Sequence, residues 1–345
     1  MTRVALDLLG GDGAPASVVD GALLAADEQD GVEVVLVGPR EVADRLLADR
    51  GASGRLAVVP ASQVVGMDED PARAVRSKRD ATVRVAARLV RDGAADAVVS
   101  VGSTGAALAA AVFTLGRLKG MTRPALAVVV PALAGPVVLL DVGANTEATP
   151  DLLAQFALAG TALAQAWLGI AEPRVGLLSI GEEAGKGDPL RRDAYAVLSA
   201  LPVDFVGNVE GRDVPHGGPA DVVVTDGFTG NVLLKGLEGA ATMLTEVVVG
   251  ALTATPERAA ATRDLLPDVT GATAARGPEA LGGGVLVGVD GVVVVGHGAS
   301  SPRAVASCIA VAAQAHGERL VPRTAEALAA LVARRREAAG LGVAP

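Results

Sequence analysis

The sequence predicts an α/β protein in which helices cover both faces of a largely parallel sheet. Short runs rich in valine and leucine alternate with longer, alanine-rich amphipathic runs along the chain, which is typical of α/β winding. Several of the short runs are apolar at every position, as expected of strands that are buried on both faces. No internal repeat and no linker rich in serine, proline or charge divides the chain, so we expect a single folded unit over residues 1–345.

The expected strands follow one another along the chain, and helices fill the intervals between them. The strands are expected at residues 3–8, 32–37, 56–59, 97–101, 125–130, 137–141, 175–180, 203–206, 221–225 and 292–295. Residues 237–284 depart from this alternation, because they contain two helical runs that meet near 253–256 and few strand signals. We therefore expect a helical excursion from the sheet in this region.

Composition limits the kinds of partner and site. Aromatic residues make up 2% of the chain and the net charge is -9, which argues against a base-stacking platform and a basic nucleic-acid surface. The single cysteine, Cys308, lies in an apolar helical run, so we expect it in the core, without a disulfide or a cysteine metal site. Asp7 stands where a signal peptide would need its apolar region, and prolines and a glycine interrupt the apolar stretch 124–140. We expect a cytoplasmic protein that does not bind nucleic acid.

Five segments that directly follow expected strands collect the unusual residues of the chain. These segments are 7–12, 100–105, 141–145, 181–187 and 225–231. In a parallel sheet such loops emerge together at the carboxyl edge of the strands, where open α/β proteins bind their ligands. We therefore expect the five loops to line one cleft.

Lysine is scarce in this chain, because all but four of the 30 lysines and arginines are arginine. An ammonium group is a compact point charge on a flexible stem, whereas a guanidinium group is a planar fork. The scarcity draws attention to Lys186 in the 181–187 loop and to Lys235, one helical turn after Asn231. The ordinary alternative for Lys186 is a solvated lysine in a charged turn.

Other polar motifs also have an ordinary structural interpretation. Ser103, Thr104 and Gly105 open a helix, so they either bind phosphate at its positive end or simply cap it. Asn231 belongs either to a binding loop or to a turn. His297 either enters the cleft or is a buried histidine. The basic cluster at 73–91 either forms a solvated face or docks an acidic partner.

Several common catalytic signatures do not occur in the sequence. The 181–187 loop has three residues between its first two glycines and a glycine after its lysine, so it does not match a P-loop. The glycines of the first loop lack the dinucleotide-binding spacing, and no G-x-S-x-G elbow is present. ATP, NAD and an enzyme nucleophile are therefore not supported, and an NAD-dependent dehydrogenase is disfavoured.

Taken in order, these motifs resemble the phosphate acyltransferases of bacterial phospholipid synthesis, the PlsX family. The resemblance covers nearly the whole chain and rests on segments 7–15, 67–80, 100–106, 123–125, 140–145, 155–157, 181–187, 226–235, 238–239, 282–283 and 297–298. Some positions differ from the common family pattern, among them Leu9, Gly13, Ala81, Thr82 and Ser103.

The resemblance implies a single catalytic domain with a three-layer α/β/α sandwich, Rossmann-like and related to phosphotransacetylases and to isocitrate and isopropylmalate dehydrogenases. It implies an enzyme that transfers a long-chain acyl group from acyl carrier protein to inorganic phosphate, without metal or cofactor. A membrane acyltransferase would then use the acyl phosphate on glycerol 3-phosphate. It also implies a homodimer in peripheral contact with membrane, and assigns these contacts to the excursion 237–284. Because residues 253–267 contain few large apolar side chains, we expect the membrane contact to be weak.

By resemblance, Lys186 and Asn231 match the catalytic positions of the family. Phosphate itself attacks the thioester, so Lys186 would position phosphate or stabilise the oxyanion, and Asn231 would donate a hydrogen bond at the reacting centre. The expected substrate-binding residues are Asp7, Gly10, Gly11, Asp12, Ser103, Thr104, Gly105, Asn145, Glu182, Glu183, Asp226, Gly227, Thr229, Gly230, Lys235 and His297.

Two rival functions fit the same motifs. The first is a short-chain phosphate acyltransferase that uses coenzyme A thioesters. The second is a non-catalytic paralogue that binds acyl carrier protein or membrane.

Overall fold

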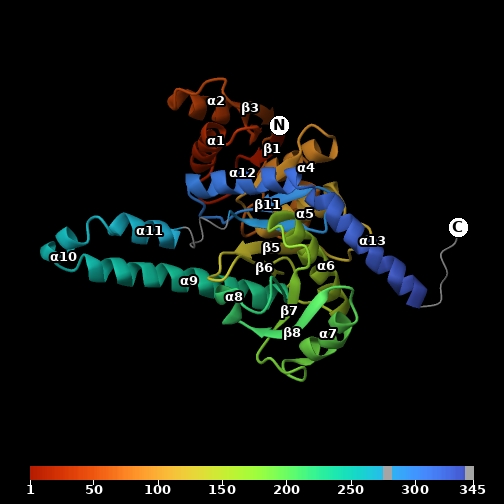
Figure 1. Ribbon diagram of the computed structural model, residues 1–345. Coiled ribbons are helices and arrows are strands. Elements are labelled where there is room, and N and C mark those ends of the chain that lie inside the picture. Colours follow the sequence, from red (N-terminus) through yellow and green to blue (C-terminus); the bar gives the residue numbers. More distant parts are fainter. Residues whose placement is uncertain (275–281, 339–345) are drawn as a thin grey trace.

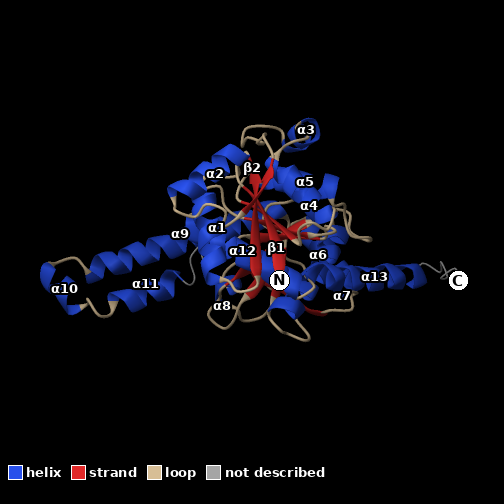
Figure 2. Ribbon diagram, turned by 90° about the horizontal axis from the view of Figure 1, so that it is seen from above, coloured by secondary structure: helices blue, strands red, loops and turns tan. Residues whose placement is uncertain are grey.

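The computed structural model describes residues 1–274 and 282–338, and its strands form one mixed, eleven-stranded sheet between two layers of helices (Figures 1 and 2). The strand order is β3-β2-β1-β4-β11-β10-β5-β6-β9-β7-β8. The strands are β1 (Thr2–Asp7), β2 (Val32–Gly38), β3 (Ala57–Pro60), β4 (Ala97–Ser100), β5 (Ala125–Val130), β6 (Val137–Leu140), β7 (Arg174–Ser179), β8 (Asp204–Glu210), β9 (Val222–Val224), β10 (Gly284–Val287) and β11 (Val292–Val295).

Alternate residues of each strand enter two separate apolar cores, one on each face of the sheet. In β1, Val4 and Leu6 pack in the first core, while Ala5 packs in the second. The first core receives α1 (Ala16–Glu28), α6 (Pro150–Trp167), α7 (Pro189–Ser199) and α12 (Pro302–Gly317). The second receives α3 (Pro71–Ser77), α4 (Thr82–Arg91), α5 (Thr104–Thr114) and the start of α9 (Gly227–Leu252). This arrangement confirms the predicted α/β class and explains why several of the strands are apolar at every position.

The remaining helices lie at the margins of these layers. They are α2 (Arg40–Asp49), α8 (Asp213–His216), α10 (Pro256–Ala261), α11 (Leu266–Ala274) and α13 (Leu320–Ala338). In the described ranges, no helix combines the length and the apolar character that a membrane crossing requires.

The sheet reverses direction in its middle, which the sequence did not predict. β10 is antiparallel to β11 and to β5, and β5 is antiparallel to β6, whereas the other neighbours are parallel. Three reversals leave β6, β7, β8 and β9 running opposite to β1, β2, β3, β4 and β11. The prediction that all five loops leave one edge of the sheet is therefore wrong. Loops 7–12 and 100–105 leave one edge, and loops 141–145, 181–187 and 225–231 leave the other.

The element that causes the reversal was missed. β10 is a four-residue strand, Gly284–Val287, at the end of the segment expected to be helical. Its residues are buried between β11 and β5, so its pairing depends on partners far away in the sequence.

The predicted helical excursion is present as an arm made of α9, α10 and α11 (Figure 1). α9 ends at Leu252 and α10 begins at Pro256 with Thr255 as its N-cap, so the predicted break near 253–256 is confirmed. The buried residues of α9 are Gly227, Gly230 and Leu234, all in its first turns, and within the described ranges of α10 and α11 no residue is buried. The expected excursion also includes residues 275–281, which lie outside the described residues.

Candidate functional site

A cavity of about 650 Å³ opens where the sheet reverses direction. Its walls come from the N-terminal end of α5, the first turns of α9, β5, the start of β10 and the segment that joins β11 to α12. The apolar lining includes Leu126, Val128, Val142, Leu234, Val295 and Cys308, and the polar lining includes Ser103, Thr104, Asn231, Lys235, Glu238 and His297. An apolar cavity with a few converging polar groups is typical of a ligand-binding site.

The N-terminal end of α5 forms one polar wall of the cavity. Ser103 is the N-cap, and its hydroxyl oxygen accepts a hydrogen bond from the Ala106 amide at 3.3 Å. The amides of Thr104 and Gly105 have no acceptor within the helix because of their position in its first turn. Ser103 is thus an ordinary cap, and the helix end that it caps still presents N–H groups and a positive dipole to the cavity.

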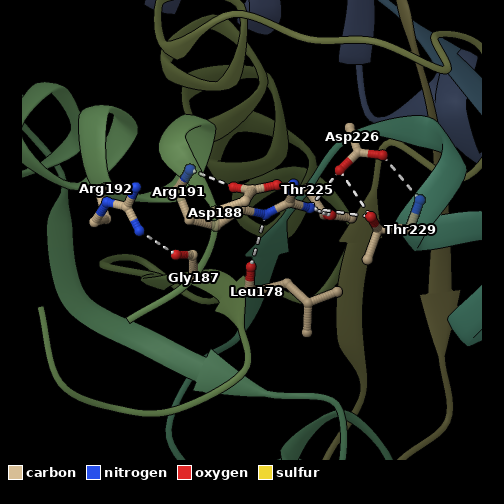
Figure 3. Close-up of polar contacts among 8 residues, drawn as sticks. All are labelled: Leu178, Gly187, Asp188, Arg191, Arg192, Thr225, Asp226 and Thr229. Carbon is tan, nitrogen blue, oxygen red and sulfur yellow. Dashed lines mark hydrogen bonds and ion pairs between the residues drawn. The ribbon is translucent and has the colours of Figure 1, made fainter. Parts of the chain in front are cut away.

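The N-terminal end of α9 is occupied by a buried ion pair instead (Figure 3). Asp226 is the N-cap and accepts hydrogen bonds from the Thr229 amide and hydroxyl, at 2.9 Å and 2.8 Å. Arg191 of α7 pairs with the same carboxylate, and it also donates to the hydroxyl oxygens of Thr225 at 2.9 Å and Thr229 at 3.1 Å. Asp226 and Thr229 were predicted to bind substrate, but their side chains already hold α7, β9 and α9 together.

This ion pair also sets the protonation of Asp226. Burial by itself would raise the pKa of Asp226, but the hydrogen bonds from Thr229 and the positive charge of Arg191 outweigh burial and lower the pKa below its usual value. A carboxylate at the N-terminus of α9 makes this helix end unfavourable for a further anion. The end of α9 is therefore less suited to an anion than the ends of α5 and α12, whose N-caps Ser103 and Ser301 belong to the cavity lining.

The loop after β6 supports α9 through two glycines. A Cβ on Gly230 would lie 1.9 Å from the carbonyl oxygen of Asp141, and a Cβ on Gly227 would lie 2.5 Å from that of Asn145. The Gly227 amide donates to the same Asn145 carbonyl at 2.7 Å. Gly227 and Gly230, both predicted to bind substrate, are required where they stand because the two backbones touch.

Asp141 organises this loop from within. Its carboxylate accepts hydrogen bonds from the amides of Leu126, Gly143, Ala144 and Asn145 and from the side-chain amide of Asn145. Burial raises the pKa of Asp141, and these hydrogen bonds act in the opposite direction. Asn145 also donates to the carbonyl of Pro124 at 2.7 Å, so its buried side chain supports the wall of the cavity.

Asn231 follows Gly230 and lies in the cavity lining. Its side-chain nitrogen donates to the carbonyl oxygen of Val142 at 3.0 Å, which holds the amide group against the loop after β6. One turn later, Lys235 is an exposed member of the same lining. Its ammonium group pairs with Glu238 at 2.7 Å and contacts Nε2 of His297. Since α9 and the segment after β11 belong to oppositely directed halves of the sheet, this contact joins the two halves at the cavity.

A smaller cavity of about 160 Å³ adjoins the first, with Met67, Gly102 and Ser103 in both linings. It is lined by the predicted residues Asp7, Gly10, Gly11 and Asp12. The buried Asp7 accepts hydrogen bonds from the Ser100 hydroxyl at 2.7 Å and the Leu9 amide at 3.3 Å. Burial raises the pKa of Asp7, against the hydrogen bonds from Thr82 and Ser100. The first predicted loop therefore reaches the site region, beside the end of α5.

The structure does not bring Lys186 into either cavity lining. Its side chain is exposed, and its amide donates to the Glu183 carbonyl at 2.9 Å within the 181–187 loop. Glu182 and Glu183 are also exposed and outside both linings. The loop nevertheless leads directly into the buried ion pair, because a Cβ on Gly187 would lie 2.6 Å from the Cβ of Arg191.

Arg191, Glu238 and Cys308 were not predicted as site residues. Arg191 looked like one surface arginine among many, and no sequence signal distinguishes it. Glu238 could have been noticed, because it stands three residues after Lys235 on the same helix. Cys308 was predicted to be core, which its 1% exposure confirms, but it also contributes to the cavity lining.

Comparison with known proteins identifies relatives along nearly the full chain. Residues 2–323 match the family described as fatty acid synthesis protein. A phosphate acyltransferase of Desulfitobacterium hafniense (strain Y51) is 45% identical over 312 residues, which cover 90% of this chain and 93% of the relative. A phosphate acyltransferase of Heliobacterium modesticaldum is 46% identical over 316 residues, which cover 90% of this chain and 93% of the relative.

Solved structures are similar at the level of the fold. A phosphotransacetylase from Streptococcus pyogenes has a TM-score of 0.58 at 16% identity and covers 95% of this chain and 94% of its own. A 4-hydroxythreonine-4-phosphate dehydrogenase from Klebsiella pneumoniae has a TM-score of 0.51 at 16% identity and covers 92% of this chain and 98% of its own. These similarities agree with the predicted relation to phosphotransacetylase and dehydrogenase folds.

Proposed function

Because the chain belongs to the phosphate acyltransferase family, we propose that it transfers a long-chain acyl group from acyl carrier protein to inorganic phosphate at the larger cavity. The acyl phosphate would then serve phospholipid synthesis through a membrane acyltransferase that acts on glycerol 3-phosphate. The observation that carries the proposal is the division of the cavity into an apolar lining and a polar wall that contains a helix end and a lysine.

Phosphate fits the polar wall. The first-turn amides of Thr104 and Gly105 and the ammonium group of Lys235 supply N–H donors and positive charge. The acyl chain fits the apolar lining, where Leu126, Val128 and Val295 offer aliphatic contact without fixed polar groups. This arrangement would place the thioester carbonyl between the bound acyl chain and the bound phosphate.

The reaction needs no nucleophile from the protein, because a phosphate oxygen attacks the thioester carbon. Catalysis would come from orientation and from stabilisation of the oxyanion, where one well-placed donor contributes roughly 10²–10³-fold. Asn231 lines the cavity and has a side-chain amide for this role. Lys186 would serve as the second catalytic group if the exposed 181–187 loop moves toward the cavity when substrate binds.

Acyl carrier protein is the proposed acyl donor, and basic residues near the cavity suit an acidic carrier. Arg73 and Arg76 of α3 are exposed, and α3 packs against α5. A Cβ on Gly105 would lie 2.7 Å from Pro71, which is the first residue of α3. The basic surface therefore begins beside the proposed phosphate site. Arg84, in contrast, is partly buried and donates to the carbonyl of Val75, so it is structural.

The arm is proposed to mediate homodimer formation and weak peripheral membrane contact of a cytoplasmic enzyme. Met243, Leu244 and Val247 are 57%, 58% and 62% exposed, and their spacing places them along one side of α9. Such an apolar stripe on a projecting helix indicates an interaction surface.

Product analysis would test the proposed reaction. The protein is incubated with inorganic phosphate and with one of three thioesters: a long-chain thioester of acyl carrier protein, a long-chain thioester of coenzyme A or a short-chain thioester of coenzyme A. Acyl phosphate is trapped with hydroxylamine. We expect phosphate-dependent acyl phosphate from the carrier thioester. Preference for a short-chain coenzyme A thioester would favour the first rival function, and no phosphate-dependent loss of any thioester would favour the non-catalytic paralogue.

A further inference from the structure

Lys235, Glu238 and His297 form a connected group at the edge of the larger cavity. Lys235 donates to the Glu238 carboxylate at 2.7 Å and contacts Nε2 of His297, and all three side chains belong to the cavity lining. A lysine ammonium group can only donate, so Nε2 of His297 accepts and the ring hydrogen lies on Nδ1. In this contact Nδ1–H is the ring donor that remains for a further partner.

The backbone that carries His297 is fixed on both sides. The carbonyl oxygen of His297 accepts hydrogen bonds from the Ser300 amide at 3.0 Å and the Ser300 hydroxyl at 2.6 Å. The carbonyl oxygen of Gly298 accepts from the Asp12 amide at 2.7 Å, which ties this segment to the loop after β1. A ring on such a backbone has a defined position relative to α9 and α5.

The proposed reaction requires a proton to move between its two substrates. When an oxygen of hydrogen phosphate attacks the thioester carbon, a C–O bond forms, the C–S bond breaks and the electron pair of that bond leaves on sulfur. The phosphate loses its proton as acyl phosphate forms, and the thiolate gains one as it becomes the free thiol. The reaction balances without an outside acid or base, but a group must carry the proton from oxygen to sulfur.

We propose that His297 is the catalytic residue that protonates the leaving thiolate, and that Lys235 and Glu238 position it and renew its proton. Nδ1–H gives its proton to sulfur while Nε2 takes one from Lys235. The proton released by phosphate then enters the ring at Nδ1 and the Nε2 proton returns to Lys235, so the ring and the ammonium group end as they began. Glu238 keeps the ammonium group beside the ring. The charged groups that face this segment are Lys235 and Glu238 on α9 and Asp12 in the loop after β1. The proposal rests on the proposed function.

A change of leaving group separates proton donation from other roles. The substrates are two thioesters with the same acyl chain, one of acyl carrier protein, an alkyl thiol, and one of an aryl thiol whose thiolate leaves without protonation. For His297→Gln we expect the rate of acyl transfer to fall by roughly 10²–10⁴-fold with the carrier thioester and by less than about tenfold with the aryl thioester. His316→Gln is the matched control, because His316 lies near Asp96 at the opposite end of β4 and should leave both rates unchanged.

Each result decides for or against the relay. Equal losses with both thioesters, or no loss with the carrier thioester, would overturn it. A second variant, His297→Gly, should recover activity toward the carrier thioester when imidazole is added, and failure to recover would also count against proton donation. If the wild-type protein turns over neither thioester with phosphate, the proposed function itself is wrong, whereas an active wild type with equal losses in His297→Gln removes the relay alone.

Discussion

Replacing Gly230 with alanine should move the start of α9 and misplace Asn231. The Cβ of alanine would lie 1.9 Å from the carbonyl oxygen of Asp141, whereas ordinary van der Waals contact begins at 3.4 Å. The next nearest atoms are Cγ2 of Thr225 at 2.9 Å and the carbonyl carbon of Asp141 at 3.0 Å. Because the closest contact is with backbone, movement of a side chain cannot relieve it. The helix would have to shift by about 1.5 Å, or the loop after β6 would have to deform.

We expect this shift of α9 to lower both the free energy of unfolding and the rate of acyl transfer. Overpacking of a closely packed contact costs about 1–3 kcal/mol, which urea unfolding would measure. A displacement of about 1 Å in a catalytic group can lower the rate by roughly 100-fold, so we expect a loss of that size in phosphate-dependent acyl transfer. The thermal midpoint and the rate would be measured on the same preparation.

Gly250 provides a matched control in the same helix. No heavy atom lies within 4 Å of a Cβ built at Gly250, and this residue is roughly 30 Å farther along the helix. Gly250→Ala should raise stability by about 0.5–1 kcal/mol and leave the rate unchanged, because alanine loses less backbone entropy than glycine in a helix. Wild-type stability and activity in Gly230→Ala would refute the argument from the close contact.

Four further predictions concern the buried and catalytic groups. Lys186→Ala should abolish acyl phosphate formation without lowering the thermal midpoint, and Lys186→Arg should restore little, because a planar fork replaces a point charge; a near-normal rate in Lys186→Ala would remove this lysine from the proposed catalytic pair. Arg191→Met should cost about 3–5 kcal/mol in urea unfolding by leaving Asp226 buried without its partner. Because the pKa of Asp226 is lowered in the folded state, its contribution to stability is complete above the usual aspartate pKa, about 3.9, and is lost as the pH falls through the lowered value. Asp226→Asn should therefore lose less stability than the wild type over that acidic window, and parallel curves would contradict the assignment. Burial raises the pKa of the Cys308 thiol to about 12, so the native protein should not react with a thiol reagent at pH 8 and should react fully in urea; rapid labelling of the native protein would show that the thiol is accessible.

Local patterns in the sequence determined the elements and many of the groups at the site. Continuous apolar runs predicted the strands, since each strand has one core on each face. The sequence Ser103-Thr104-Gly105 before an alanine-rich run predicted a helix start that faces the site, because a cap depends on neighbours a few residues away. Scarcity of lysine singled out Lys235, which lies in the cavity lining, as well as Lys186, which lies outside both linings.

Tertiary structure decided which of these groups meet. β10 pairs with β11 and β5, so the direction of the sheet reverses through contacts between distant segments, which no local pattern contains. The reversal separates the loops that the sequence placed at one edge, and α9 then brings Lys235 back to His297 across the cavity. Long-range packing also decides the burial of Arg191 and its pairing with Asp226, because α7 packs against β7, the neighbour of β9 in the sheet. Hydrophobic periodicity fixes which face of an element is buried, but the partners of a polar group depend on long-range packing that only the folded chain defines.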